Sequence, residues 1–353
     1  MRKTNLKALS KQEMEVFVLA SGLPAFRAKQ ALHWIYEKRA QSILEISELS
    51  KDLREKLSAR AYTSNLELLE RQRSKDGTEK FLFGLEDGES VESVLIPDED
   101  RLTLCISSQV GCAMGCRFCL TGKLGIRRNL AAFEIVDQVI SVGRLVAPDQ
   151  ITNIVFMGMG EPLANFGNVV EALLRITGLL KISPKRITLS TSGIAPKILE
   201  LSKEAPMVNL AISLNATTDE VRNYLMPVNK TYPLMALLDA CRRFPLPARR
   251  RITFEYVLLK GINDTLEDAR RLVHLLKGIP SKVNLIPFNP HQGSEFHRPE
   301  ERRVIEFQDI LVGAHMTAII RKSKGQDILA ACGQLKAKYS SEKIIFSSGS
   351  LPS

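Results

Sequence analysis

Three closely spaced cysteines stand near the end of the segment Cys105-Ile-Ser-Ser-Gln-Val-Gly-Cys112-Ala-Met-Gly-Cys116-Arg-Phe-Cys119. Cys112, Cys116 and Cys119 form a C-x₃-C-x₂-C triplet in a loop rich in glycine and small residues, with no fourth cysteine at comparable spacing. Iron–sulfur clusters are normally held by four thiolates. A four-iron cluster held by only three leaves one iron open, and that iron can bind a small chelating ligand.

The spacing of the triplet, with the aromatic Phe118 just before the last cysteine, resembles that of the radical S-adenosylmethionine (SAM) enzymes. In those enzymes the open iron binds the amino and carboxylate groups of SAM. The alternative is a structural zinc site, which needs four Cys or His ligands. No histidine lies between Arg39 and Pro233, so the fourth zinc ligand would have to come from a distant part of the chain. The ligand count therefore favours the cluster.

Length and composition are those of an ordinary globular protein. The chain has 353 residues, of which 44% are hydrophobic and 25% charged. Its first residues contain no apolar signal core, and no apolar run reaches the roughly 18–20 residues that span a bilayer. Six cysteines, three of them in one metal-type triplet, fit a reducing compartment better than a disulfide framework. These features predict a cytoplasmic protein that does not contact membranes.

The net charge of +10 and the isoelectric point near 9.3 predict an anionic partner. Basic residues gather in five clusters, Lys123/Arg127/Arg128, Arg242/Arg243, Arg249/Arg250/Arg251, Arg302/Arg303 and Arg321/Lys322/Lys324. Together they favour nucleic acid over a surface that is basic only for solubility. Aromatic residues make up only 6% of the chain, so an extended base-stacking surface is not indicated.

The chain before Arg101 divides into two parts. Residues 1–62 predict a small helical accessory domain, with a capping box at Ser10 to Glu13 and a helix start at Ser50. Residues 63–100 predict a β-hairpin linker, because two Asp-Gly pairs separate short β-type runs at Asp76 and Asp87. In the last run Glu92 shares a face with apolar residues. Either it reaches solvent from an edge strand or it is buried with a role.

Residues 101–338 alternate between strand and helix, which predicts parallel strands with right-handed crossovers. The expected strands are Leu102–Ile106, Ile151–Met157, Arg186–Ser190, Val208–Leu214, Ile252–Leu258, Val283–Pro287 and Thr317–Arg321. The expected helices are Phe133–Val146, Val169–Leu180, Pro196–Lys203, Leu234–Phe244, Leu266–Leu276 and Glu300–Val312. The fold class is therefore α/β, an incomplete (β/α) barrel, followed by a flexible tail over 339–353. The resemblance of the cysteine triplet implies that this is a radical-SAM barrel.

In such barrels the chemistry lies at the carboxyl ends of the strands. Polar and glycine-rich tripeptides follow these ends here, at Gly158-Met-Gly160-Glu161-Pro162, Ser190-Thr-Ser192-Gly193, Ser213-Leu214-Asn215 and Phe288-Asn289-Pro290. If SAM is the ligand, Gly158 and Gly160 let the backbone approach it closely. Glu161 can accept hydrogen bonds from its ammonium group. Short polar groups for its carboxylate, ribose and adenine come from Ser192, Ser213, Asn215 and Asn289.

Two further cysteines are placed for chemistry. Cys105 ends the first barrel strand, and Cys332 follows the last strand within Ala-Ala-Cys-Gly-Gln. The first and last strands are neighbours if the sheet curls round, which would bring the two thiols together at the mouth. Cys241, in a helix, fits a small buried hydrophobe instead.

Nearly the whole chain resembles the RlmN/Cfr family of radical-SAM methyltransferases, which act on adenine in RNA. The resemblance rests on motifs spread along the sequence: Leu23-Pro-Ala-Phe-Arg-Ala-Lys-Gln30, Val91-Glu-Ser-Val-Leu-Ile-Pro97, Cys105 to Cys112, Thr121-Gly-Lys-Leu-Gly-Ile-Arg-Arg-Asn129, Gly158 to Pro162, Ser190 to Gly193, Ile286-Pro-Phe-Asn289 and Ala330-Ala-Cys-Gly-Gln334. The RlmN branch, which methylates C2 of adenine in 23S rRNA and some tRNAs, resembles the chain most.

The resemblance implies a two-stage reaction that uses one [4Fe-4S] cluster and two SAM molecules per turnover. Cys332 takes a methyl group from one SAM, and a 5′-deoxyadenosyl radical from the second removes hydrogen from it. The resulting radical adds to adenine, and attack by Cys105 on the Cys332 sulfur releases the product and leaves a Cys105–Cys332 disulfide. Glu92 matches the position assigned as proton acceptor, although Cys105 could take that proton. The expected partners are 23S rRNA and tRNA, which the accessory domain of residues 1–62 would help to bind. A flavodoxin or ferredoxin is the expected electron donor, and the enzyme is expected to be a monomer.

The sequence also departs from the family pattern. Asn215 stands where many members carry histidine, and Leu120 stands where alanine is frequent. Two other functions stay open, a Cfr-type C8 adenine methyltransferase and a zinc-bearing RNA-binding module. The chemistry explains why methylation at C2 needs a radical, because the amidine carbon C2 of adenine is electrophilic and does not attack a methyl sulfonium, but it does not separate C2 from C8. A radical route avoids this mismatch.

Overall fold

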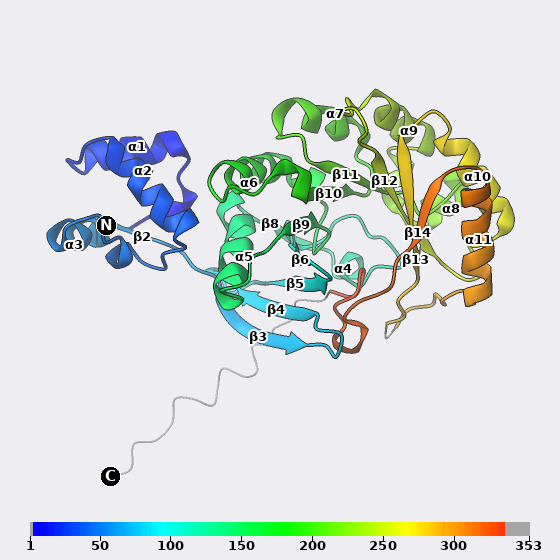
Figure 1. Cartoon of the computed structure of the whole chain (residues 1–353), viewed down its shortest axis with the longest axis horizontal. Helices are drawn as coiled ribbons and strands as arrows, with labels where there is room; N and C mark the ends of the chain where they lie inside the picture. The colour runs from blue at the N-terminus through cyan, green and yellow to red at the C-terminus, as the bar shows by residue number, and fades with distance from the viewer. Residues whose placement is uncertain (1–2, 292, 336–353) are drawn as a thin grey trace, which may run out of the picture.

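A computed structural model describes residues 3–291 and 293–335 of the chain (Figure 1). A small helical module at the N-terminal end stands beside a larger α/β body. The predicted flexible tail over 339–353 lies outside the described residues. The division into residues 1–62, 63–100 and 101–338 stays a prediction.

The N-terminal module consists of short helices and one small parallel sheet. Its elements are β1 (Thr4–Asn5), η1 (Leu6–Ala8), α1 (Lys11–Ala20), α2 (Phe26–Leu32), η2 (His33–Glu37), η3 (Ile43–Glu45), α3 (Lys51–Arg60) and β2 (Ala61–Tyr62). The predicted capping box is confirmed, since the Glu13 N–H donates to Ser10 Oγ at 3.2 Å and the Ser10 N–H donates to Glu13 Oε2 at 2.7 Å. Ser50 caps α3 as predicted, with the Leu53 N–H donating to its hydroxyl.

The linker forms an antiparallel extension of the main sheet. Its strands are β3 (Glu67–Arg73), β4 (Glu79–Gly84) and β5 (Ser90–Asp98). Both predicted Asp-Gly turns are confirmed, and Gly77 and Gly88 each have a φ of +84°. An L-residue with a side chain adopts this conformation only with strain, which is why glycine stands at both positions.

The parallel half of the main sheet follows in chain order. Its strands are β6 (Arg101–Cys105), β9 (Asn153–Phe156), β10 (Ile187–Thr191), β11 (Asn209–Ser213), β12 (Ile252–Leu258), β13 (Ser281–Pro287) and β14 (Thr317–Ile320). In the described residues the strand order is β14-β13-β12-β11-β10-β9-β6-β5-β4-β3, with parallel pairing from β6 to β14. The predicted incomplete barrel is thereby confirmed.

Helices cover the outer side of the parallel strands (Figure 1). They are α5 (Ala132–Leu145), α6 (Phe166–Gly178), α7 (Ala195–Glu204), α9 (Leu234–Arg243), α10 (Leu266–Leu276) and α11 (Glu301–Gly313). These six were predicted. The sequence patterns did not predict β7 (Gln109–Gly111), α4 (Leu120–Lys123), β8 (Ile126–Asn129) and α8 (Asp219–Leu225), nor the 3₁₀ turns η4 (Pro162–Asn165), η5 (Pro184–Arg186), η6 (Pro227–Lys230) and η7 (Gln326–Ile328).

The expectation that the first and last barrel strands are neighbours is wrong. β6 pairs with β5 on one side and β9 on the other, so the hairpin extension occupies the edge that β14 would need. The segment after β14 crosses the open side instead, as the orange and red trace in Figure 1 shows. It is held where the Gly325 N–H donates to Asp76 at 2.9 Å and the Leu120 N–H donates to the Gly333 carbonyl at 2.7 Å.

A buried polar contact joins the N-terminal module to the barrel. Lys7 and Asp137 of α5 form an ion pair of 2.6 Å, and both side chains are 1% exposed. Arg175 of α6 donates to the Lys7 carbonyl at 2.6 Å and to the Tyr36 hydroxyl at 3.2 Å. These bonds fix the module against α5 and α6. No helix in the described part of the chain combines the length and apolar character that crossing a bilayer requires.

Candidate active site

A cavity of about 180 Å³ lies at the carboxyl ends of the parallel strands. Its wall is built from residues that follow β9, β10, β11 and β13, from the cysteine loop and from the segment after β14. Most predicted site residues line it, namely Cys112, Cys116, Cys119, Gly160, Glu161, Ser192, Ser213, Asn215, Asn289 and Cys332. Glu92, Cys105 and Leu214 lie outside this lining.

Tight backbone packing shapes the cysteine loop. The Cys112 N–H donates to the Gly125 carbonyl at 2.9 Å, and the Cys119 N–H donates to the Cys116 carbonyl at 3.1 Å. A Cβ added at Gly122 would lie 3.0 Å from the backbone of Cys116, so the loop has no room for a side chain there. The three thiols are therefore held on one wall of the cavity by backbone contacts.

The donor set fits an iron–sulfur cluster. Burial raises the pKa of the Cys112 thiol to about 12 and raises the pKa values of Cys116 and Cys119, so a metal must displace their protons. Among residues 3–291 and 293–335, no three His, Cys, Asp or Glu side chains are grouped as ligands of one metal ion. In a four-iron cluster each thiolate binds a different iron, which allows a wider spacing on the wall.

Two neighbouring side chains fit a polar organic ligand. The Ser192 hydroxyl is buried on the cavity wall and has no hydrogen-bond partner among the described residues. A buried polar atom without a partner costs free energy unless a ligand or water satisfies it. Beside it, the Glu161 carboxylate accepts from the Thr191 hydroxyl and the Ser192 N–H, both at 2.7 Å, and from the Leu163 N–H at 3.0 Å.

Glu161 is held by these three bonds and is 3% exposed. Burial raises the pKa of its carboxyl, and the hydrogen bonds from Ser192 and Thr191 oppose that rise. The carboxylate has acceptor positions beyond the three in use. Its orientation toward the cavity is therefore fixed before any ligand binds, with capacity left for an ammonium group.

The two glycines before Glu161 are required by close packing within the protein, and their close approach to a ligand stays a prediction. A Cβ at Gly158 would lie 2.7 Å from the Ile106 carbonyl group. A Cβ at Gly160, where φ is +99°, would lie 2.5 Å from the side chain of Gln109. Both glycines border the cavity, but what excludes a side chain is the protein segment after β6.

The two predicted asparagines already have partners within the protein. Asn215 has a φ of +57°, and its Oδ1 accepts from the Val257 N–H at 2.8 Å. Asn289 Oδ1 accepts from the Ser323 hydroxyl at 2.5 Å and from Gln326 Nε2 at 2.9 Å. Asn289 thus ties the segment that leads to Cys332 to the end of β13.

Cys332 and Cys105 lie near each other, although they stand close to the two ends of the barrel sequence. Cys332 is exposed into the cavity, yet the surrounding walls raise the pKa of its thiol to about 11, chiefly through burial and then through the charge of Glu255. Cys105 is buried in a small apolar cluster with Met159 and Ala330. Its pKa is raised by this burial and, secondly, by the nearby Cys332. The six cysteines, all among the described residues, are free thiols.

Glu92 is buried, and the edge-strand interpretation is wrong. It is 6% exposed on β5, which lies between β4 and β6. Lys80 Nζ is 3.3 Å from its carboxylate, and the Ser107 hydroxyl donates to its backbone carbonyl at 2.7 Å. Its carboxylate is thus buried and paired with a cation, outside the cavity lining.

Sequence patterns missed two charged residues at the site. Arg222 of α8 is fully buried and donates to the carbonyls of Ser192, Leu214 and Ser213 at 2.7, 3.0 and 3.1 Å. In the sequence it looks like one more charge in a polar helix, and only its contacts reveal it. Glu255 lines the cavity and accepts from Asn284 at 2.9 Å. A carboxylate within the apolar strand Ile252–Leu258 was the available signal.

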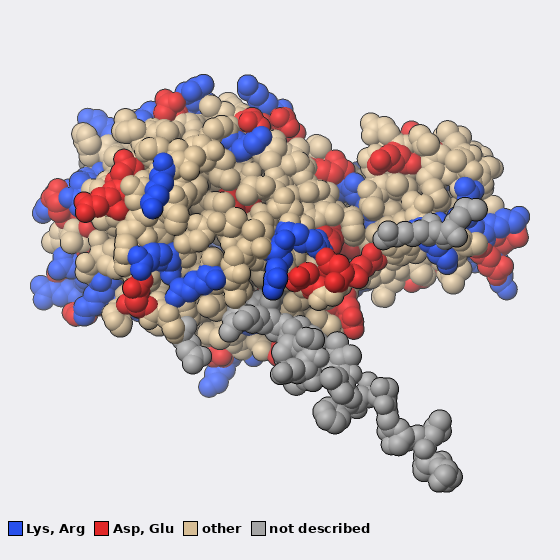
Figure 2. Space-filling model, turned by 180° about the vertical axis from the view of Figure 1, so that it is seen from behind, with Lys and Arg blue, Asp and Glu red and all other residues tan. Residues whose placement is uncertain are grey.

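The basic clusters are partly neutralised within the protein. Arg128 pairs with Glu134 at 2.7 Å and with Asp87 at 2.5 Å, and Arg302 pairs with Glu306 at 2.8 Å. On the face shown in Figure 2, basic and acidic side chains are intermixed and separated by uncharged areas. The net charge remains positive, but on this face it forms no single basic stripe.

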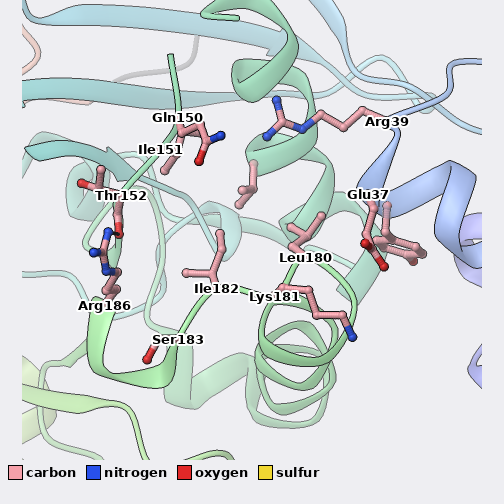
Figure 3. Close-up of a pocket in the computed structure, with 12 residues that line it drawn as sticks. Glu37, Arg39, Gln150, Ile151, Thr152, Leu180, Lys181, Ile182, Ser183 and Arg186 are labelled. Atoms are coloured by element: carbon pink, nitrogen blue, oxygen red, sulfur yellow. Dashed lines mark hydrogen bonds between the residues drawn. The ribbon is translucent and has the colours of Figure 1, made fainter. Parts of the chain in front are cut away.

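A larger hollow of about 480 Å³ lies at the amino ends of β9 and β10, between the N-terminal module and the barrel (Figure 3). Glu37 and Lys181 lie on one side of it and Thr152 and Arg186 on the other. It contains no cysteine and no predicted site residue. Size alone therefore does not locate the chemistry, and the smaller, thiol-lined cavity is the candidate active site.

Comparisons with known proteins agree with this geometry. The model of the Radical SAM superfamily matches residues 106–276, and that of the ribosomal RNA large subunit methyltransferase N-terminal domain matches residues 4–63. The chain is 56% identical to a dual-specificity RNA methyltransferase RlmN from Pelobacter propionicus, over 95% of this chain and 96% of that one. It is 55% identical to the protein of that name from Geobacter sulfurreducens, over 96% and 94%. A radical SAM methyltransferase structure from Sphaerobacter thermophilus matches with a TM-score of 0.90 and 42% identity, covering 95% of this chain and 100% of that chain.

Proposed function

Because the chain belongs to the RlmN family of radical SAM methyltransferases, we propose that it methylates C2 of an adenine in 23S rRNA and in tRNA. The observation that carries the proposal is the meeting of two cysteine sets at one cavity. The C-x₃-C-x₂-C thiols and Cys332 share its wall, and Cys105 packs directly behind it.

Cys112, Cys116 and Cys119 would hold one [4Fe-4S] cluster per chain, which would supply the electron for reductive cleavage of SAM. Glu161 and Ser192 are placed to orient the ligand, with the partners described above. Preorganised polar groups contribute most when their geometry is fixed before the reaction. Arg222 supplies that fixation by holding the carbonyls of the cavity residues Ser192 and Ser213 and of the neighbouring Leu214.

Cys332 would carry the methyl group, because its sulfur is exposed into the same cavity. Cys105 would attack the Cys332 sulfur after the methylene carbon has bonded to adenine, so that the carbon–sulfur bond breaks and a disulfide forms. This step would release one proton and one electron, and the electron would pass to the cluster. The Cys105 side chain is buried beside the segment carrying Cys332, which suits a thiol that must reach one partner only. Either Glu92 or Cys105 would accept the ring proton.

The target adenine must leave its stack to enter the cavity, which costs a few kcal/mol. The N-terminal module and the net charge of +10 would hold the folded RNA meanwhile. The proposal further includes two SAM molecules per turnover, a flavodoxin or ferredoxin as electron donor, a monomeric state and a cytoplasmic location.

The test is anaerobic turnover with isotopically labelled SAM on naked 23S rRNA and tRNA, followed by nucleoside analysis. We expect the label in 2-methyladenosine. Label in 8-methyladenosine would instead show Cfr-type chemistry. A preparation that binds zinc, contains no iron and methylates neither RNA would show the zinc-bearing RNA-binding module and refute the proposal.

A further inference from the structure

One exposed aromatic side chain stands at the rim of the candidate active site. Among the described residues, the aromatic side chains on the exposed surface are Phe26 and Tyr224, and Tyr224 is 42% exposed. The guanidinium carbon of Arg117 lies 4.1 Å from the centre of the Tyr224 ring. The Arg117 side chain is itself 43% exposed and is oriented by Glu295 at 2.9 Å. We call these two side chains the Arg117–Tyr224 pair.

The pair is built from a loop and a helix at the same end of the barrel as the cavity. Arg117 lies in the cysteine loop between Cys116 and Phe118, and Tyr224 lies in α8, which follows β11. The Arg117 N–H donates to the Leu225 carbonyl at 3.0 Å, which joins the two loops. The pair therefore sits beside the cluster ligands.

Aromatic contacts connect the pair with the cavity wall. The Tyr224 ring meets Phe296 edge-on at 6.3 Å between ring centres, and Phe296 meets Phe288 in the same manner at 6.2 Å. Phe288 lines the cavity. Through these contacts the position of the exposed ring is fixed relative to the cavity that would receive an adenine.

A planar cation stacked on an exposed ring suits one chemical class of ligand. Single-stranded RNA is recognised by stacking unpaired bases on aromatic rings or on arginine guanidinium planes. Such stacking accepts any base, since each base has a π-face. A flipped adenine leaves its neighbour in the chain without a stacking partner, and that neighbour must lie at the rim of the cavity.

We propose that the Arg117–Tyr224 pair is the stacking platform for the nucleobase adjacent to the target adenine. The inference rests on the proposed function and specifies how that site holds its RNA. The low aromatic content of the chain excludes an extended stacking surface but not one local platform.

The test uses Tyr224→Leu, which keeps an apolar contact with Phe296 but cannot stack, and Tyr224→Phe, which can. Each is assayed with a chemical reductant on RNA with an intact or an abasic nucleotide on either side of the target. We expect Tyr224→Leu to lower kcat/KM by about ten- to hundredfold on intact RNA and Tyr224→Phe to stay near wild type. When the abasic nucleotide stands at one of the two positions, kcat/KM of the wild type should fall by a similar factor. At that position kcat/KM of Tyr224→Leu should fall little further than it does on intact RNA. Phe26→Leu, which removes the other exposed ring beside a cation, should show no such coupling.

The outcomes separate the inference from the proposed function. The platform is refuted if, at both abasic positions, the abasic nucleotide and Tyr224→Leu lower kcat/KM by independent factors that multiply. A loss of RNA-independent methyl loading on Cys332 in Tyr224→Leu would also overturn it, since the pair would then only hold the cysteine loop. A defect seen with a flavodoxin donor but absent with the chemical reductant would assign the pair to donor docking and also overturn it. If the wild type methylates no RNA, the proposed function itself fails.

Discussion

The guanidinium of Arg222 donates a 2.7 Å hydrogen bond to the backbone carbonyl of Ser192, although Arg222 lies in α8 after β11 and Ser192 follows β10. The same side chain also holds Leu214, Ser213 and the side chain of Asn229. Burial lowers the pKa of Arg222 to about 10, which still leaves it charged at neutral pH. One buried cation thus sets the relative positions of two loops on the cavity wall.

Replacing Arg222 by methionine should destabilise the fold and weaken SAM binding. The change removes four hydrogen bonds donated by a buried cation, at about 1.5–3 kcal/mol each, so a loss of at least about 3 kcal/mol is expected. Urea unfolding and SAM binding to the anaerobic protein measure the two effects. Arg243→Met, at an exposed pair with Asp239, should change stability by less than about 0.5 kcal/mol. Equal unfolding midpoints for the two variants would refute the assigned role.

Replacing Cys332 by alanine should abolish methyl loading of the protein and all RNA methylation. Its thiol is the one on the cavity wall outside the cysteine triplet, so iron content should stay at the wild-type level. Mass spectrometry of the protein and iron analysis test both points. Cys241→Ala, in the buried face of α9, is the matched control and should retain methylation. Full activity of Cys332→Ala would refute the carrier role.

Replacing Cys105 by alanine should leave RNA covalently attached to Cys332. Without the buried thiol behind the cavity, no nucleophile remains to break the carbon–sulfur bond. Denaturing gel electrophoresis with labelled RNA detects the adduct, and nuclease digestion followed by mass spectrometry locates it. If free methylated RNA accumulates and no adduct forms, another group resolves the intermediate.

Replacing Lys7 by methionine should loosen the N-terminal module from the barrel. It leaves the Asp137 carboxylate buried without its cation, which typically costs about 3–5 kcal/mol. The double variant Lys7→Met/Asp137→Leu should recover most of that loss, because neither charge remains. Lys56→Met, at the exposed pair with Asp52, should cost less than about 0.5 kcal/mol. Thermal unfolding of the wild type and the three variants shows whether the buried ion pair stabilises the protein or contributes nothing.

Asp76 should attach the segment before Cys332 in a pH-dependent way. Partial burial opposes ionisation, but hydrogen bonds from the Gly325 N–H and from Thr78 lower the pKa of Asp76 to about 2. An unfolded aspartate has a pKa near 3.9, so this stabilisation is present above about pH 4 and is lost as the pH falls toward 2. Hydrogen exchange at Gly325 should be faster in Asp76→Ala at pH 7. Asp98→Ala, at an exposed pair with Arg101, should leave it unchanged. Equal exchange in wild type and Asp76→Ala would contradict this attachment.

The elements that repeat along the chain were predictable. The alternation of apolar strands and amphipathic helices gave the barrel strands and outer helices to within about two residues at most ends, since side-chain periodicity is a local property. The conformation of turns such as Asp76-Gly77 likewise depends mainly on the turn residues themselves. The short hairpin β7–β8 and helix α8 have no such periodicity and were missed.

By itself, the sequence determined the chemistry of the site, because ligand type and spacing depend on residues close together in the chain. Cys112, Cys116 and Cys119 are an example, and so are the polar tripeptides at the strand ends. Only the tertiary structure decided which groups meet. Cys332 lies near Cys105 because its segment crosses the open side of the sheet and bonds to Asp76, not because the barrel closes. Arg222 looks like a surface charge until the fold buries it, since burial depends on contacts between residues distant in sequence.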